Sequence, residues 1–198
     1  RGGMAGMNTG PGFAGDFGAP EREIPATGMA GVDWESCMTM NNHWGYNKNN
    51  DAGYKSSSEL IRKLVETSSK GGNFLLNVGP TAAGTFPQLS LERLQSIGAW
   101  MDINGEAIHG TSASPFAFLP WGRCTMKREG DLTHLYLHVF EWPQDGRLVV
   151  PGIGNRVTHA QLLADPTRKI APLPVHGDLV LRLLPTEAPD ESVSVIKL

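Results

Sequence analysis

The sequence predicts an α/β region followed by an all-β domain, and two observations lead to this fold class. Between residues 32 and 104, short apolar runs alternate with amphipathic helical segments, which is the βα order of an α/β barrel or a doubly wound sheet. After residue 111, short alternating segments follow one another with turn residues between them, which is typical of a β-sandwich. We therefore expect two domains, residues 1–111 and 112–198.

The α/β region opens with a Gly/Pro-rich stretch, residues 1–31, which cannot form an interior strand or helix and is expected to be a loop. Residues 32–40 alternate apolar and polar side chains and predict a strand. A helix is expected at 57–70, because Ser56 and Glu59 form a capping box ahead of an apolar face at helical spacing.

A second βα unit follows directly. The apolar run 73–79 predicts a strand buried on both faces, as in a parallel sheet covered by helices. Apolar residues at spacings of three and four then predict a helix that ends at Asn104 and Gly105. The boundary with the β domain is expected between Gly110 and Trp121, where Pro and Ser are frequent.

Composition excludes several classes of function. The formal net charge of −3 offers no basic face for phosphates, so no nucleic acid partner is expected. No apolar run reaches the roughly 18 residues that a membrane span requires. Cys37 and Cys124 match no metal spacing and are expected to be small buried residues rather than a disulfide. His134 and His138 share one face of a predicted strand without a third ligand, which favours structural histidines. Neither a metal nor a cofactor is expected.

The stretch from Gly15 to Asn47 carries the residue types that chemistry needs. It places the carboxylate of Glu21 on a loop and ends in an aromatic turn that contains Trp44 and Tyr46. Loops on a regular scaffold are where catalytic and binding side chains are commonly presented. Taken alone, Glu21 would be a solvated carboxylate and Trp44 a packing residue.

Three runs carry a resemblance to a known family: WESCMTMNNHWGYN, ELIRKLVETSSKGGNFLLNVGPTAAGTFP and ERLQSIGAWMDINGEAIHGT. Together they resemble the α-L-fucosidases of glycoside hydrolase family 29, over residues 1–111. The resemblance implies the terminal βα units of a (β/α)8-type barrel, incomplete in this chain, followed by a β-sandwich. The implied activity is retaining hydrolysis of terminal α-L-fucosyl linkages in oligosaccharides or glycoconjugates.

The resemblance also implies roles for single residues. The family pattern D-F-x-[TA]-x-E corresponds to residues 16–21, which makes Glu21 the candidate acid/base. Trp44 corresponds to the aromatic residue that packs near the methyl group of the sugar, and Arg1 to an arginine that reaches the sugar pocket. Family members are secreted, periplasmic or lysosomal, so the resemblance leaves the compartment open.

One part of the implied machinery is expected to be missing. In the family, the nucleophilic aspartate lies on a strand well upstream of the acid/base, so this chain is expected to begin inside a larger domain. Four local carboxylates are disfavoured as replacements, with Glu35 expected to face away from Glu21; the four are Asp16, Glu23, Asp33 and Glu35.

Three hypotheses remain open. The first is a fucosidase segment completed by an N-terminal part or by another chain. The second is a truncated, catalytically silent protein that still binds carbohydrate, and the third is a structural module that acts in assembly. Half a barrel would expose strand edges and apolar helix faces, so association or aggregation is expected, with a missing N-terminal segment or a homo-oligomer as the candidate partner.

Overall fold

The computed structural model describes residues 16–49, 53–168, 170–183 and 187–198. The chain divides into two compact units, residues 1–99 and 100–198. Helix α2 (Gln88–Asn104) contributes residues to both. The division into domains at residues 1–111 and 112–198 stays a prediction.

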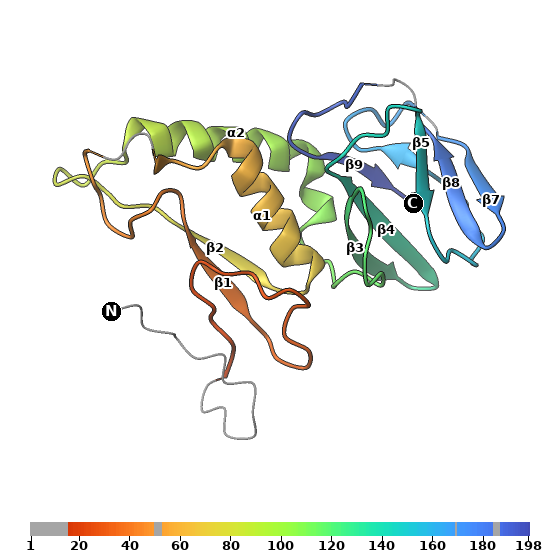
Figure 1. The fold of residues 1–198 in the computed structure, drawn as a ribbon, viewed down its shortest axis with the longest axis horizontal. Coiled ribbons are helices and arrows are strands. Elements are labelled where there is room, and N and C mark those ends of the chain that lie inside the picture. The colour runs from red at the N-terminus through yellow and green to blue at the C-terminus, as the bar shows by residue number, and fades with distance from the viewer. Residues whose placement is uncertain (1–15, 50–52, 169, 184–186) are drawn as a thin grey trace. The chain divides into compact units, whose positions relative to one another are not determined.

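The first unit is built on two parallel strands, β1 (Glu35–Thr39) and β2 (Asn73–Asn77), joined through helix α1 (Ser57–Ser69). Figure 1 shows α1 lying across one face of this sheet. A strand, a helix and a parallel strand form the βα arrangement that the sequence predicts. The first unit thus contains two parallel strands of the expected α/β region.

Helix α1 begins and ends where the sequence predicts. The Ser56 hydroxyl accepts a hydrogen bond of 3.0 Å from the Glu59 amide, which satisfies one of the free N–H groups of the first turn. Gly71 follows the last turn with a φ of 80°, the left-handed conformation that commonly closes a helix. On the apolar face, Leu60, Ile61 and Val65 are buried, with Leu60 and Val65 at 0% exposure.

Strand β2 differs from its prediction. It was expected to be buried on both faces, but Asn73 and Leu75 are exposed, and Leu75 keeps 47% of its surface accessible. Its partner β1 shows the same asymmetry, since Ser36 and Met38 are buried at 0% and 2% exposure while Cys37 between them is only half-buried. The run is apolar, yet within the described residues the second face of the sheet is uncovered around Cys37 and Leu75, and it becomes buried only at Thr39.

Trp34, directly before β1, anchors the first unit. The indole is 2% exposed, and the Trp34 carbonyl accepts a 2.9 Å hydrogen bond from the Asn73 amide at the start of β2. Gly72 lies against the indole so closely that a Cβ at this position would overlap the ring. A glycine is therefore required here by space rather than by backbone conformation.

The second unit is a two-sheet β-sandwich, as predicted. One antiparallel sheet has the order β3-β4-β9-β6 and the other the order β5-β8-β7. The strands are β3 (Gly122–Glu129), β4 (Leu132–Val139), β5 (Arg147–Val150), β6 (Gln161–Leu162), β7 (Pro172–Val175), β8 (Asp178–Arg182) and β9 (Ser194–Lys197). Both sheets contribute fully buried residues to one core, among them Leu137 and Leu181.

A buried polar pair closes the sandwich on its helical side. His138 on β4 is 0% exposed, and its Nε2 lies 3.0 Å from the Thr125 hydroxyl on β3. Thr125 donates a 2.6 Å hydrogen bond to the carbonyl of Ala107, in the short helix η2 (Gly105–Ala107). Burial lowers the pKa of His138 to about 3, so this imidazole is neutral.

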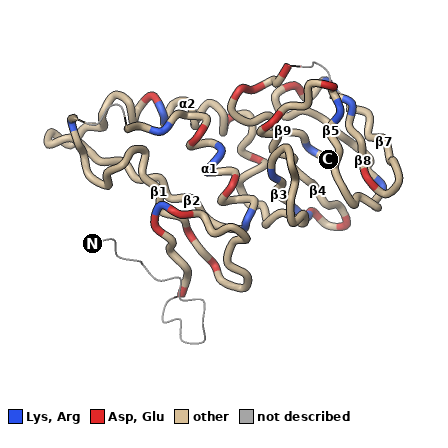
Figure 2. Tube along the Cα trace, in the orientation of Figure 1, with Lys and Arg blue, Asp and Glu red and all other residues tan. Residues whose placement is uncertain are grey.

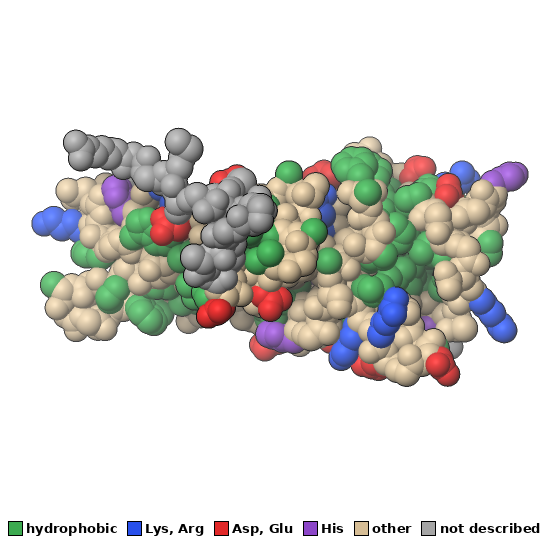
Figure 3. All heavy atoms as spheres, turned by 90° about the horizontal axis from the view of Figure 1, so that it is seen from below, with side chains coloured by type: hydrophobic (Ala, Val, Ile, Leu, Met, Phe, Trp, Pro, Cys, Tyr) green, Lys and Arg blue, Asp and Glu red, His purple; other side chains and the backbone are tan. Residues whose placement is uncertain are grey.

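The surface carries mixed charges. Figure 2 shows Lys and Arg interspersed with Asp and Glu along the chain rather than gathered in one stretch. On the face drawn in Figure 3, hydrophobic side chains also lie among polar ones. In the described part of the chain, no helix is both long and apolar enough to cross a membrane. Among those same residues, no group of three His, Cys, Asp or Glu side chains is arranged to hold a metal ion.

Candidate active site

Glu21 ends a short extended segment that runs beside β1 as a third, parallel line of backbone. Gly18 pairs with Trp34, and Glu21 pairs with Cys37. The Cys37 amide donates to the Pro20 carbonyl at 3.2 Å, and the Arg22 amide donates to the Cys37 carbonyl at 2.7 Å. The loop predicted around Glu21 is thus partly strand-like, with its backbone fixed by the sheet.

This pairing determines which face of the sheet Glu21 occupies. Residues in register on neighbouring strands point to the same face. Glu21 is in register with Cys37, which is in register with Leu75 on β2. These three residues, hereafter the open-face row, lie on the face opposite Ser36 and Met38, which are buried. The candidate acid/base is therefore presented on the uncovered face of the sheet.

The pKa of the Cys37 thiol depends on its burial and on two neighbouring carboxylates. Burial raises the pKa of the Cys37 thiol, and the carboxylates of Glu21 and Glu35 raise it further because a thiolate would sit close to their negative charges. Cys124, in the sandwich core, is fully buried, and burial raises the pKa of its thiol to about 12. Cys37 is thus a half-buried thiol within electrostatic range of Glu21, which the sequence did not indicate.

Among the four local carboxylates, Glu35 has an unexpected position. It lies two residues from Cys37 on β1, so its side chain shares the open face with Glu21 rather than facing away. Standard strand spacings place its Cα roughly 8 Å from that of Glu21. Glu23 is carried away from this face, because its carbonyl accepts a 2.8 Å hydrogen bond from the Ser36 hydroxyl.

Trp44 lies in the turn that follows β1, and it is 39% exposed. The side chain of Asn77, the last residue of β2, donates a 2.7 Å hydrogen bond to the Trp44 carbonyl. Gly79 approaches Tyr46 so closely that a Cβ at position 79 would lie 2.5 Å from the Tyr46 amide nitrogen. The aromatic turn is therefore held against the carboxyl end of the neighbouring strand.

A shallow hollow, open to solvent, lies behind this turn. Its wall is formed by residues that follow β1, residues that follow β2 and the start of α2; they are Met40, Asn41, His43, Gly45, Tyr46, Tyr54, Asn77, Val78, Gly79 and Ser90. His43 is fixed within it, since its amide donates to the Asn41 side chain at 2.9 Å and its Nε2 lies 3.1 Å from Asn47 Nδ2. His43 is a polar residue of the site region that the sequence did not single out.

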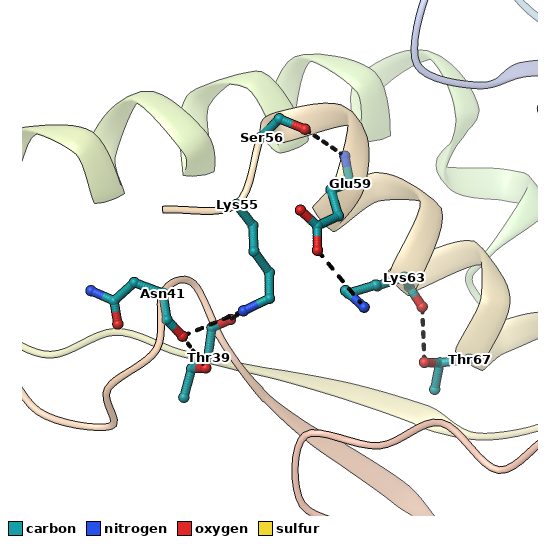
Figure 4. Close-up of polar contacts among 7 residues, drawn as sticks. All are labelled: Thr39, Asn41, Lys55, Ser56, Glu59, Lys63 and Thr67. Atoms are coloured by element: carbon teal, nitrogen blue, oxygen red, sulfur yellow. Dashed lines mark hydrogen bonds and ion pairs between the residues drawn. The ribbon is translucent and has the colours of Figure 1, made fainter. Parts of the chain in front are cut away.

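Lys55 holds the carboxyl end of β1 in place. Figure 4 shows its ammonium group between two backbone carbonyls, with hydrogen bonds of 2.8 Å to Thr39 and 3.4 Å to Asn41. Burial lowers the pKa of Lys55, with smaller contributions from nearby Arg22 and Lys63, while Glu59 opposes the shift. The loop that carries Trp44 thus starts from a rigid point.

The structure describes two of the three predicted site residues. Glu21 and Trp44 are each held by backbone hydrogen bonds next to the β1–β2 sheet, but from different segments and without a hydrogen bond between them. Arg1 lies outside the described residues. The arrangement offers a carboxylate on an open sheet face and an aromatic side chain beyond the strand ends, a pairing suited to proton transfer and to packing against an apolar sugar face.

Comparison with known proteins identifies the same region. The α-L-fucosidase family model matches residues 4–106. An α-L-fucosidase of Dictyostelium discoideum is 42% identical over 135 residues, 66% of this chain and 28% of that protein. Human tissue α-L-fucosidase is 34% identical over 153 residues, 74% of this chain and 30% of that protein. The chain thus spans about a quarter to a third of the curated relatives it matches.

Solved structures agree in fold. α-L-Fucosidase isoenzyme 1 from Paenibacillus thiaminolyticus has a TM-score of 0.84 and 37% identity, covering 94% of this chain and 45% of its own. A family 29 α-L-fucosidase of Bacteroides thetaiotaomicron, trapped as a covalent intermediate with 2-fluoro-fucosyl fluoride in a glutamate-to-glutamine mutant, has a TM-score of 0.81 and 30% identity, covering 93% of this chain and 43% of its own. The chain belongs to the α-L-fucosidase family, glycoside hydrolase family 29.

Proposed function

We propose that this chain forms part of a retaining α-L-fucosidase in which Glu21 is the general acid/base. The observation that carries the proposal is the register of Glu21 with Cys37, which presents the carboxylate on the open face of a parallel sheet. Family membership supplies the substrate class, a terminal α-L-fucosyl group of an oligosaccharide or glycoconjugate. The fold we propose for residues 1–111 is the terminal part of a (β/α)8-type barrel.

The retaining route needs two carboxyl groups about 5 Å apart, one to attack the anomeric carbon and one to move a proton. The covalent intermediate of the Bacteroides relative supports this route for the family. In the first step, Glu21 would protonate the glycosidic oxygen as the bond to the sugar breaks. In the second, the same residue would take a proton from the water that releases fucose.

We place the nucleophilic carboxylate outside these 198 residues, and Trp44 and Arg1 beside the sugar. Glu35 shares the face of Glu21, but it precedes Cys37 on β1, toward the amino end of the strand, whereas Glu21 is in register with Cys37. Trp44 would pack its ring against the C–H face of fucose near the methyl group. The isolated chain is therefore expected to release almost no leaving group from an aryl α-L-fucoside.

A chimera tests the role of Glu21. The matching segment of the Paenibacillus enzyme is replaced by this chain, and kcat/KM is measured on methyl α-L-fucoside, whose leaving group needs a proton. Glu21→Gln is expected to lower it by about 10² to 10⁴, because general acid catalysis is lost. Glu23→Gln is the matched control, since the Glu23 backbone carbonyl bonds to Ser36 rather than continuing the pairing with β1, and it should leave the rate nearly unchanged.

An activated substrate provides the second half of the test. An aryl fucoside with a good leaving group needs no proton in the first step, so that step should be much less sensitive to Glu21→Gln. Equal losses on both substrates would contradict the acid/base role. Turnover by the isolated chain that disappears on Glu21→Gln would instead contradict a nucleophile outside the chain.

A second candidate function, binding of carbohydrate without catalysis, rests on the exposed Trp44 beside the hollow. It predicts that the isolated chain binds fucose with an affinity that Trp44→Ala abolishes and Glu21→Gln does not change. Titration followed by tryptophan fluorescence or calorimetry would measure it.

A further inference from the structure

The residue after Glu21 has an unusual backbone conformation. Arg22 has a φ of 58°, in the left-handed region that residues other than glycine seldom occupy. Within the described residues, the other non-glycine case is His176, with a φ of 50°. His176 and Gly177 form the two-residue turn between β7 and β8, a hairpin that requires this conformation. Arg22 lies in no hairpin, so its conformation needs another explanation.

Hydrogen bonds fix the chain on both sides of Arg22. Its own amide donates to the Cys37 carbonyl at 2.7 Å. One residue later, the Glu23 carbonyl accepts a 2.8 Å hydrogen bond from the hydroxyl of Ser36, which is fully buried. Cys37 and Ser36 point to opposite faces of the sheet because they are neighbours on β1. The chain therefore leaves the open face within two residues of Glu21.

We propose that the left-handed turn at Arg22 is a positioning device for Glu21, a role that rests on the function proposed above for that carboxylate. Were Arg22 extended, the segment would continue alongside β1 and Glu23 would lose its bond to Ser36. The turn ends the pairing at Glu21 and keeps this carboxylate in the open-face row beside Cys37. Arg22 acts through its backbone, and it is a positioning residue rather than a catalytic one.

Cys37 allows the position of Glu21 to be measured without turnover. The rate at which neutral iodoacetamide alkylates a thiol follows the fraction of thiolate. Removing the Glu21 charge should therefore speed the alkylation of Cys37, whose thiol pKa that charge helps to raise. Two charges about 6 Å apart in a solvent-like medium predict an effect of roughly threefold at pH 8. Cys124 serves as an internal control for the second unit, because its buried thiol should react only when that unit unfolds.

The experiment measures the Glu21→Gln effect in three backgrounds of the full chain by mass spectrometry of the Cys37 peptide: the unchanged chain, Arg22→Asn and Arg22→Val. Asparagine tolerates the left-handed region, whereas a β-branched residue does not. The ratio of Cys37 alkylation rates with and without Glu21→Gln should stay at roughly three with Arg22→Asn. With Arg22→Val, this ratio should fall to nearly one. Glu35→Gln is the matched control, because Glu35 and Cys37 share β1 and their coupling should survive both substitutions.

The outcomes separate positioning from a purely structural role. An equal Glu21→Gln effect in all three backgrounds would overturn the proposal, as would its loss together with the Glu35→Gln effect in a variant whose circular dichroism spectrum matches that of the unchanged chain. If Arg22→Val changes that spectrum, Arg22→Ala is measured instead under the same criteria. The alkylation experiment involves no catalysis, so a negative result would reject the role of Arg22 and leave the proposed function standing. Conversely, an inactive chimera would not change the alkylation result.

Discussion

The sheet of the first unit and the sandwich of the second bury their apolar residues in different ways. In the sandwich, two sheets cover each other, and Leu137 on β4 and Leu181 on β8 are both 0% exposed. In the first unit, α1 covers one face of β1 and β2, while Leu75 on the other face is 47% exposed. The closed core of the sandwich therefore contributes stability, whereas the open face of the β1–β2 sheet presents Glu21.

Shortening a leucine in the closed core should have the largest effect on stability. Leu181→Ala removes fully buried methyl groups and should lower the free energy of unfolding of the second unit by about 2–5 kcal/mol. Leu75→Ala makes the same chemical change on the open face and should cost less than about 1 kcal/mol. Urea unfolding of both variants measures the two values. A comparable loss for Leu75→Ala would mean that its face is covered in solution.

The free energy of unfolding of the second unit should depend on pH through His138. Burial lowers the pKa of His138 to about 3, whereas an ordinary histidine in the unfolded chain has a pKa near 6.5. Between these two pH values the unfolded chain binds a proton at His138 and the folded chain does not. Stability is then fully present above pH 6.5 and is lost as the pH falls toward 3. Between pH 6.5 and 4 this loss should reach about 3 kcal/mol.

Replacing the imidazole should remove that dependence. His138→Gln is expected to flatten the stability profile between pH 6.5 and 4 relative to the unchanged chain, whatever its cost at neutral pH. The profile is measured by urea unfolding at several pH values. A variant with the same acid slope as the unchanged chain would show that other groups cause the loss.

The smallest effects concern two glycines of the first unit. Gly72→Ala should destabilise it by about 1–3 kcal/mol, because the added carbon overlaps the Trp34 ring. Gly98→Ala, in α2, meets open space and should be stabilising by about 0.5–1 kcal/mol, since alanine favours a helix. Thermal melting followed by circular dichroism compares them. Equal shifts of the same sign would contradict the close approach to Trp34.

Local signals in the sequence predicted the local structure well. Ser56 caps α1, the chain leaves α1 at Gly71, and α2 ends at Asn104, because caps and helical periodicity depend on neighbours in sequence. The β-sandwich was also predicted, since its strands are short, alternating and separated by turns.

What the sequence could not show depends on pairings between distant segments. The open face of β2 was missed because an apolar run does not reveal how many faces are covered. The position of Glu35 was misjudged, since the face it shares with Glu21 follows from the register with Cys37. The conformation of Arg22 carries no composition signal, because arginine is not a residue that marks left-handed turns. The role proposed for Glu21 rests on the family resemblance.

Azide rescue of a Glu21→Ala chimera tests most directly whether Glu21 is the acid/base. The quantity to measure is the anomeric configuration of the fucosyl azide that forms. An acid/base variant still forms the fucosyl-enzyme from an activated fucoside, and azide attacks it without needing a general base. If Glu21 is the acid/base, azide should rescue turnover and yield α-L-fucosyl azide, with the configuration of the substrate. The β-L-fucosyl product would identify Glu21 as the nucleophile, and no rescue in a folded chimera would contradict either role.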